Sequence, residues 1–263
     1  MKRLCVVKIG GHIVDDSRAL QGFLRDFSVL DGPKILIHGG GKSVSGMSAR
    51  LGIPVSMVEG RRITDAATLE VVVMMLAGVA NKQIVAALQS LECNAIGLTG
   101  ADGGTILAQK RPLRGAINYG MVGDIAQVAS ERIERLLAFG FVPVFTALTH
   151  DGKGQLLNTN ADTVASALAV SMSEYYRTEI FYCFEKSGVL LELSDEASVV
   201  HRIDRRVYND LHEKGCLQGG MLPKIDNAFA ALDAGVQRVW IGLASDMRDA
   251  ALGSRTCGTT IIL

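Results

Sequence analysis

The stretch "KILIHGGGKS", residues 34–43, joins a short apolar run to three consecutive glycines and then to a helical pattern. A glycine cluster followed by Lys42 and Ser43 is typical of phosphate-binding loops. The nucleotide P-loop, G-x-x-x-x-G-K-[ST], would place its first glycine at position 36. That position is Leu36, inside the apolar run, so the spacing excludes a P-loop. The bare N–H groups of glycines at a strand end still favour an anion, and the alternative is a plain flexible turn.

Short apolar runs alternate with longer helical patterns along the whole chain. The runs lack a strict period of two, as is typical of parallel strands covered on both faces. We therefore expect an α/β fold with a mainly parallel sheet, helices on both faces, and ligands at the carboxyl ends of the strands. The patterns predict strands over residues 4–9, 34–38, 95–98, 142–147, 179–184 and 236–243, and helices over residues 17–30, 42–51, 65–91, 130–139, 161–173 and 221–234.

Two segments stand apart from this alternation. Residues 100–125 are glycine-rich and irregular, which fits a hairpin at the mouth of a substrate site. The polar and aromatic stretch near residue 175 marks a division of one continuous sheet into two lobes. The helical pattern over residues 65–91 is apolar on all sides for several turns, so we expect it to be largely buried, with a partner subunit as one candidate cover.

The composition indicates a globular protein with a substantial core. Of 263 residues, 48% are hydrophobic, and 27 basic residues balance 27 acidic ones, which removes any general attraction to nucleic acid or anionic membrane. We find no apolar stretch of the ~20 residues that a membrane span needs, and no signal peptide. The five cysteines are scattered, and we interpret them as reduced thiols of a cytoplasmic protein.

Lys8 lies at the end of the first apolar run and is followed by Gly10 and Gly11. A lysine in such a run is costly unless its ammonium group meets an anion. The alternative is an edge-strand lysine whose head reaches water. Because a second glycine cluster also follows a strand, the sequence favours an anion site shared by the two turns.

Three further motifs carry candidate binding residues. In "NTNAD", Asn158, Asn160 and Asp162 precede a helix, so they either cap it or bind a polar substrate. In "QGGMLPK", Lys224 lies in the first turns of a helix, where a cation opposes the dipole unless it serves a bound anion. Arg62 in "EGRRIT" could form a bidentate pair with a carboxylate, or could be a surface arginine.

The sequence shows no metal-ligand spacing and no nucleophile elbow. We therefore predict no protein metal site. The histidines are widely separated, and we interpret them as structural or surface residues. They are His12, His38, His150, His201 and His212.

Taken together and in this order, the motifs resemble those of the amino acid kinase family over essentially the whole chain. The resemblance implies a three-layer αβα sandwich forming a single domain, residues 1–263. Its N-lobe, residues 1–175, would bind an acyl amino acid and dimerise, and its C-lobe, residues 176–263, would bind the nucleotide. The motifs that carry the resemblance are "KIGG" (8–11), "HGGG" (38–41), "GRRIT" (60–64), "AGVANK" (77–82), "GLTGADGG" (97–104), "NTNAD" (158–162) and "GGMLPK" (219–224).

The resemblance implies phosphoryl transfer from ATP, with Mg²⁺, to the side-chain carboxylate of an N-acyl-L-glutamate in arginine biosynthesis, with the N-acetyl compound as the expected substrate. Lys8 and Lys224 would stabilise the transferring phosphoryl group, and Asp162 would hold both lysines. The substrate would be bound by Gly11, Gly40, Gly41, Arg62, Asn158 and Asn160. The ATP site would comprise Gly10, Glu185, Lys186, Ser187, Gly188, Leu190, Gly219, Gly220 and Met221.

The chain departs from the family pattern in its nucleotide lobe. Members usually show Ser/Thr-Asp-Val where this chain has Phe184, Glu185 and Lys186, which changes the expected ribose or adenine contacts. Arginine-inhibited members carry an additional N-terminal helix that links dimers into hexamers. Since this chain begins at its first strand, we expect a plain homodimer without arginine feedback.

Several alternatives to this function stay open. A kinase of the same fold could act on N-succinylglutamate, acetylaminoadipate, a nucleotide or carbamate. A protein of another class, an inactive kinase-like binding protein, is a further alternative, and Lys8, Asp162 and Lys224 argue against it.

Overall fold

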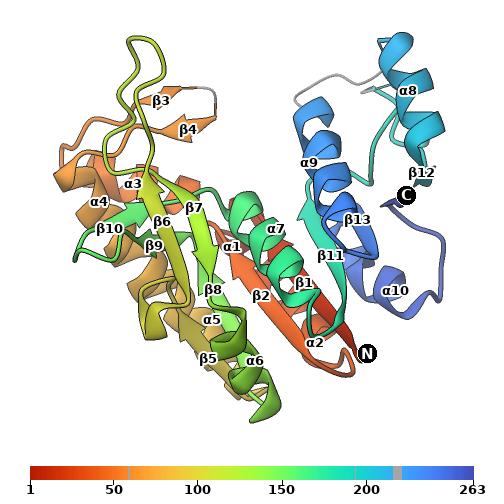
Figure 1. Ribbon diagram of the computed structural model, residues 1–263, viewed down its shortest axis with the longest axis horizontal. Coiled ribbons are helices and arrows are strands. Elements are labelled where there is room, and N and C mark those ends of the chain that lie inside the picture. Colours follow the sequence, from red (N-terminus) through yellow and green to blue (C-terminus); the bar gives the residue numbers. More distant parts are fainter. Residues whose placement is uncertain (59, 193, 216–220) are drawn as a thin grey trace.

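A central sheet of eight strands organises the chain (Figure 1). The structure is a computed structural model that describes residues 1–58, 60–192, 194–215 and 221–263. The β13–β14 pair is antiparallel and the other paired neighbours are parallel. All six predicted strands lie in this sheet, so the expected mainly parallel sheet is confirmed. In order, the strands are β12 (Arg202–Ile203), β14 (Thr259–Ile261), β13 (Arg238–Leu243), β11 (Arg177–Phe184), β1 (Arg3–Ile9), β2 (Lys34–His38), β8 (Val142–Thr146) and β5 (Ala95–Leu98).

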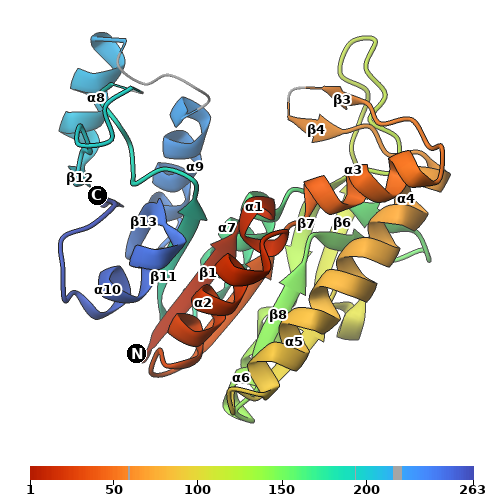
Figure 2. The ribbon, with the colours of Figure 1, turned by 180° about the vertical axis from the view of Figure 1, so that it is seen from behind.

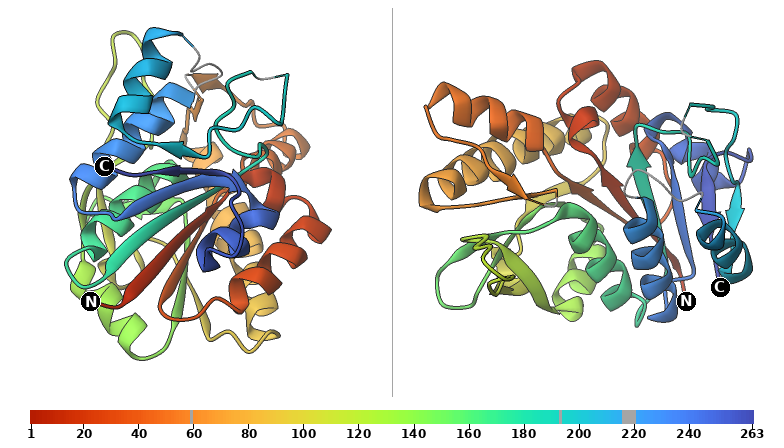
Figure 3. Two further views of the ribbon diagram at one scale, coloured as in Figure 1. Left: turned by 90° about the vertical axis from the view of Figure 1, so that its right-hand side faces the viewer. Right: turned by 90° about the horizontal axis from the view of Figure 1, so that it is seen from above.

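Helices cover both faces of this sheet, as the views from behind, from one side and from above show (Figures 2 and 3). Alternate residues of β1 explain the two layers, because Val6 belongs to one core cluster and Val7 to the other. The expected three-layer αβα sandwich is therefore confirmed. The Val6 face carries α6 (Ser130–Ala138), α7 (Ala161–Met172), α8 (Arg205–Glu213) and α9 (Met221–Asp233), and the Val7 face carries α1 (Gly11–Val14), α2 (Ser17–Ser28), α5 (Asn81–Gln89) and α10 (Met247–Leu252).

A second sheet of four strands and a short hairpin lie beside the central sheet (Figure 1). The antiparallel pair β6–β7 forms the hairpin that we expected within residues 100–125. A third core cluster lies between α3, α4 and the strand β9. The remaining elements are β10 (Leu156–Asn158), β9 (Leu148–His150), β6 (Ile106–Lys110), β7 (Gly123–Val128), the hairpin β3 (Met57–Val58) with β4 (Arg61–Arg62), α3 (Gly41–Arg50), and the 3₁₀ turns η2 (Asp102–Gly104) and η3 (Ala244–Asp246).

One long helical run spans Ala66–Gln89 and is built from α4 (Ala66–Val72), the π-helical segment η1 (Val73–Ala80) and α5. Its N-cap is Asp65, whose carboxylate accepts a hydrogen bond from Thr68 N (2.8 Å). By length and composition this run could cross a membrane, so the expectation that no such apolar stretch exists is wrong. Its buried side chains, Leu69 and Ile84 among them, belong to the core clusters, as in the core helix of a folded domain.

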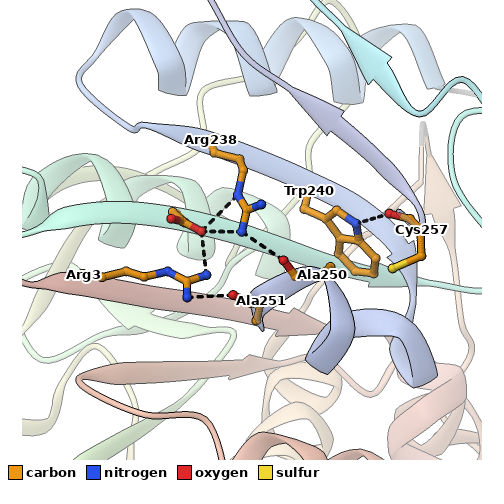
Figure 4. A network of polar contacts seen from close by, with 7 residues as sticks. Arg3, Arg238, Trp240, Ala250, Ala251 and Cys257 are labelled. Carbon is orange, nitrogen blue, oxygen red and sulfur yellow. Dashed lines mark hydrogen bonds and ion pairs between the residues drawn. The ribbon is translucent and has the colours of Figure 1, made fainter. Parts of the chain in front are cut away.

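A polar network joins the amino ends of three strands (Figure 4). Glu179 of β11 accepts hydrogen bonds from Arg3 of β1 (2.8 Å) and Arg238 of β13 (2.6 and 3.0 Å). The two guanidinium groups also donate to the carbonyls of Ala251 and Ala250 in α10, at 2.8 and 3.2 Å. The network therefore links α10 to the amino ends of three strands, away from the carboxyl end of β1.

Candidate active site

Lys8 lies near the carboxyl end of β1, beside Tyr182 of the parallel strand β11. Its side chain is only 10% exposed, and its Nζ lies 2.8 Å from Oδ1 of Asp162 in the first turn of α7. A buried ammonium group needs such a counter-charge. After Ile9, Gly10 is the N-cap of α1 and Gly11 its first residue, so the phosphate-type turn expected from the sequence lies next to this ion pair.

Lys224, the fourth residue of α9, reaches the same place from another element. Its Nζ lies 3.8 Å from the centroid of the Phe184 ring, and Nζ of Lys8 lies 5.1 Å from the same centroid. Burial lowers the pKa of Lys224; the Asp162 carboxylate opposes this shift, and the Lys8 ammonium adds to it. The structure thus brings the three predicted catalytic residues together around one aromatic ring.

The glycine turn after β2 approaches this cluster. Gly40 has φ +157°, a backbone conformation that favours glycine, and a Cβ at this position would lie 2.7 Å from Cδ2 of Leu76, whose side chain would have to move. Gly41 begins α3, and the first N–H groups of a helix have no intrahelical partner. Lys42 and Ser43 belong to the first turn of α3, as we expect once a P-loop is excluded.

A cavity of about 200 Å³ lies beside the glycine turn. Arg62 is 9% exposed, and its Nη2 donates to Gly41 O (3.0 Å) and to Ser45 Oγ (2.8 Å). Its Nη1 is buried and has no hydrogen-bond partner among the described residues. Burial lowers the pKa of Arg62. Five of the six predicted substrate residues line this cavity: Gly40, Gly41, Arg62, Asn158 and Asn160.

The two asparagines are held by different partners. Asn158 Nδ2 donates to Thr64 Oγ1 (3.0 Å). Asn160 Oδ1 accepts from the backbone N–H groups of Asp162 (2.9 Å) and Thr163 (3.1 Å), so it is the N-cap of α7. Capping occupies the oxygen of Asn160, and the same side chain lines the cavity, so the two interpretations of "NTNAD" are compatible.

His12 and Glu185 form a contact that sequence reasoning missed. Nδ1 of His12, in α1, lies 3.3 Å from Oε1 of Glu185, which follows β11. Both line an open cavity of about 510 Å³ together with Gly11, Gly41 and Arg62. We expected His12 to be structural or on the surface, and its position directly after the "KIGG" turn was the available signal.

The other predicted nucleotide residues make contacts of their own. Lys186 Nζ lies 3.6 Å from Oε1 of Glu196, and Ser187 Oγ donates to Glu196 O (3.3 Å). A Cβ at Gly188 would lie 2.7 Å from Thr259 Oγ1. Leu190 is buried and forms a bridge to Val199, Met221 begins α9, and Gly219 and Gly220 lie outside the described residues.

Two of the described features bear on cofactors. Within residues 1–58, 60–192, 194–215 and 221–263, no group of three or more His, Cys, Asp or Glu side chains could hold a metal ion. A cavity of about 380 Å³ lies between α7 and α9, and Asp162, Phe184 and Lys224 line it. The arrangement offers two cations, one carboxylate and two glycine turns, which suits an anionic phosphoryl group.

Comparisons with known proteins agree with this arrangement. The acetylglutamate kinase of Cytophaga hutchinsonii is 48% identical over 100% of this chain and 99% of its own length. That of Parabacteroides distasonis is 47% identical over 94% of this chain and 96% of its own. The structure of N-acetylglutamate synthase from Neisseria gonorrhoeae, complexed with coenzyme A and N-acetyl-glutamate, is 20% identical and shares the fold, with TM-score 0.83 over 100% of this chain and 59% of that one. The model of the amino acid kinase family matches residues 3–242, and the chain belongs to that family.

Proposed function

We propose that the chain is an acetylglutamate kinase, which transfers the γ-phosphoryl group of ATP to the side-chain carboxylate of N-acetyl-L-glutamate in arginine biosynthesis. The names of its full-length relatives support this activity. The observation that carries the proposal is the cluster of Lys8, Asp162 and Lys224 beside a cavity lined by Arg62.

The residues of the cluster account for the chemistry. The substrate carboxylate attacks the γ-phosphorus in line with the departing ADP oxygen, so the enzyme supplies positioning and charge stabilisation rather than a nucleophile. Lys8 and Lys224 donate to the equatorial oxygens on which negative charge develops. Asp162 fixes the Lys8 ammonium at 2.8 Å. The N–H groups of Gly11 and Gly41 provide donors on the same side.

Arg62 is the proposed anchor of the amino acid. Its Nη2 is held by Gly41 and Ser45, which leaves the buried Nη1 for the α-carboxylate of the substrate. Guanidinium groups pair well with carboxylates in this way. Asn158 and Asn160 then face the remaining polar groups of the acyl amino acid in the same cavity.

ATP is proposed to lie on the C-lobe, residues 176–263, against Gly10, Glu185 to Leu190 and the start of α9 at Met221. The acyl amino acid lies on the N-lobe, residues 1–175. Mg²⁺ commonly enters such sites on the nucleotide phosphates with one or two carboxylates as further ligands. Among the described residues, Glu185 lines the open cavity with Gly11 and Gly41, and Asp162 lines the cavity with Lys224, so these are the carboxylates available to contribute.

A coupled assay of ADP release tests the function. We expect turnover with N-acetylglutamate, ATP and Mg²⁺, and much lower kcat/KM with N-succinylglutamate and with acetylaminoadipate. Preference for either analogue would reassign the substrate within the same fold. Failure to turn over all three would instead support the inactive binding protein.

We further propose that the enzyme is a cytoplasmic homodimer. The long run Ala66–Gln89 exposes Met74 (47%) and Val79 (44%) on η1, and this is the apolar surface that we propose to pack against a second copy of the chain.

A further inference from the structure

We infer that Phe184 is a positioning residue for phosphoryl transfer, whose ring face holds the ammonium groups of Lys8 and Lys224. This inference rests on the catalytic roles proposed for the two lysines. Phe184 is also the position at which the sequence departs from the usual family pattern, so the general family mechanism does not explain it.

The geometry of the ring supports this role. A cation within about 6 Å of an aromatic centroid is attracted by the negative ring face. Nζ of Lys224 lies at 3.8 Å and Nζ of Lys8 at 5.1 Å, so one ring serves both cations.

The charges around the ring explain why a second attraction is needed. Asp162 forms a direct ion pair with Lys8 at 2.8 Å. Among the described residues, Lys224 has no carboxylate within ion-pair distance, although burial and the Lys8 ammonium both lower its pKa. The ring offsets part of the cost of burying this second cation. The ring contacts only one side of the ammonium group. The other N–H donors of Lys224 therefore stay available for phosphoryl oxygens.

The ring is itself fixed by its neighbours. Tyr182 lies two residues earlier on β11 and therefore points to the same face of the sheet. The two rings stack with centroids 6.0 Å apart and an interplanar angle of 20°. The Tyr182 hydroxyl donates to the backbone carbonyl of Asp162 at 3.2 Å. Tyr182 thus links the ring that holds the lysines to the helix that carries their counter-charge.

Fluorinated phenylalanines introduced site-specifically at position 184 test the inference. Fluorine withdraws charge from the ring face and changes its size little. Across phenylalanine, 4-fluoro-, 3,5-difluoro- and 3,4,5-trifluorophenylalanine, we expect kcat to fall stepwise, by about 3- to 10-fold at the trifluoro ring. Phe184→Leu, which keeps an apolar side chain without a π face, should lose at least as much activity.

A second readout separates cation binding from packing. A weaker ring face should favour the neutral form of Lys224, so the alkaline limb of kcat/KM for ATP should move to lower pH along the series. The charged groups that face Lys224 are Asp162 of α7, Lys8 of β1 and Glu185 after β11, and fluorination leaves them in place.

Phe181 provides a matched control. Its ring lies on the same strand and also faces cations, Arg3 at 5.8 Å and Arg238 at 5.3 Å, which belong to the amino ends of their strands. The same fluorinated series at position 181 should leave kcat unchanged, with any effect confined to thermal stability. If kcat stays constant across the fluorinated series at position 184 while Lys224→Ala is strongly impaired, the role inferred for Phe184 is wrong and the proposed lysine roles stand. Unchanged turnover of Lys224→Ala would overturn the proposed lysine roles.

Discussion

At the scale of single residues, the two lysines carry the proposed chemistry. Replacing Lys8 or Lys224 with alanine removes one donor that acts on developing charge, which costs ~3 to 4 kcal/mol, or about 10²- to 10³-fold in kcat. The substrate dissociation constant should change little, because the interaction strengthens only in the transition state. Steady-state kinetics and equilibrium binding measured on the same variants check both expectations.

The exposed lysine Lys153 gives the control for these variants, since it lies in the loop between β9 and β10. Lys153→Ala should retain normal kcat and KM. A rise in KM with unchanged kcat in Lys8→Ala or Lys224→Ala would mean that the lysine contributes uniform binding and not transition-state stabilisation.

Arg62 should act on binding rather than on the chemical step. Truncation to alanine removes the guanidinium group that is proposed to meet the substrate α-carboxylate. We expect KM for N-acetylglutamate to rise by about 10²-fold, since a hydrogen bond to a charged group is worth ~1.5 to 3 kcal/mol. KM for ATP should stay near its original value. Arg50→Ala, at the exposed end of α3, is the matched control, and equal losses in both variants would contradict the assignment.

His38 should make stability depend on pH. Burial lowers its pKa to about 4, and both ring nitrogens are used, since Nδ1 donates to Gly39 O and Nε2 accepts from Asn81 Nδ2. The unfolded chain binds this proton near pH 6.5, whereas the folded chain binds it only near pH 4. The stability from neutral His38 is therefore present above pH 6.5 and lost as the pH falls towards 4, by about 3 kcal/mol in total.

Urea unfolding between pH 4 and 7 measures this dependence. The His38→Gln variant should lose less stability across that window than the parent protein, because its side chain cannot bind the proton. If the free energy of unfolding falls equally with pH in the two proteins, His38 is excluded as the cause of the pH dependence.

At the scale of elements, Glu179 connects β1, β11, β13 and α10. Glu179→Gln leaves Arg3 and Arg238 without their shared carboxylate, which should cost about 2 kcal/mol of unfolding free energy, below the value for fully buried pairs because the groups are partly exposed. Since the network lies at the amino ends of the strands, kcat should not change. Glu131→Gln, which breaks an exposed i,i+4 pair with Arg135, should cost at most about 0.5 kcal/mol.

The elements also show what the sequence could predict. The six long apolar strands were predictable because parallel strands buried on both faces leave continuous runs such as residues 34–38. The short strands β12 and β14 have two and three residues, too few for a period. Helix α8 was not predicted, although Leu211 lies in the core and Val207 and Tyr208 pack against it.

At the scale of the whole molecule, sequence motifs located residues that the fold gathers from distant positions. Lys8 and Lys224 were singled out because each breaks a local rule: one is a charge inside an apolar strand and the other a cation at a helix start. The role of Asp162 came from the family resemblance. The position of His12 after the "KIGG" turn marked it as a candidate, but its contact with Glu185 and the place of the Phe184 ring beside both lysines could not be predicted. Those contacts depend on which side chains the parallel register of β1 and β11 places together, and that register leaves no local signal.

The proposed dimer makes a prediction about the assembled molecule. If η1 packs against a second copy, Val79→Glu would bury a charge in an apolar interface, which costs more than the contact gains. We expect the parent protein to sediment at twice the 28.0 kDa chain mass and Val79→Glu to sediment as a single chain. Leu252→Glu, at an exposed site on α10, should leave the mass unchanged. A monomeric parent protein would rule out the dimer, and a dimeric Val79→Glu variant would place the interface elsewhere.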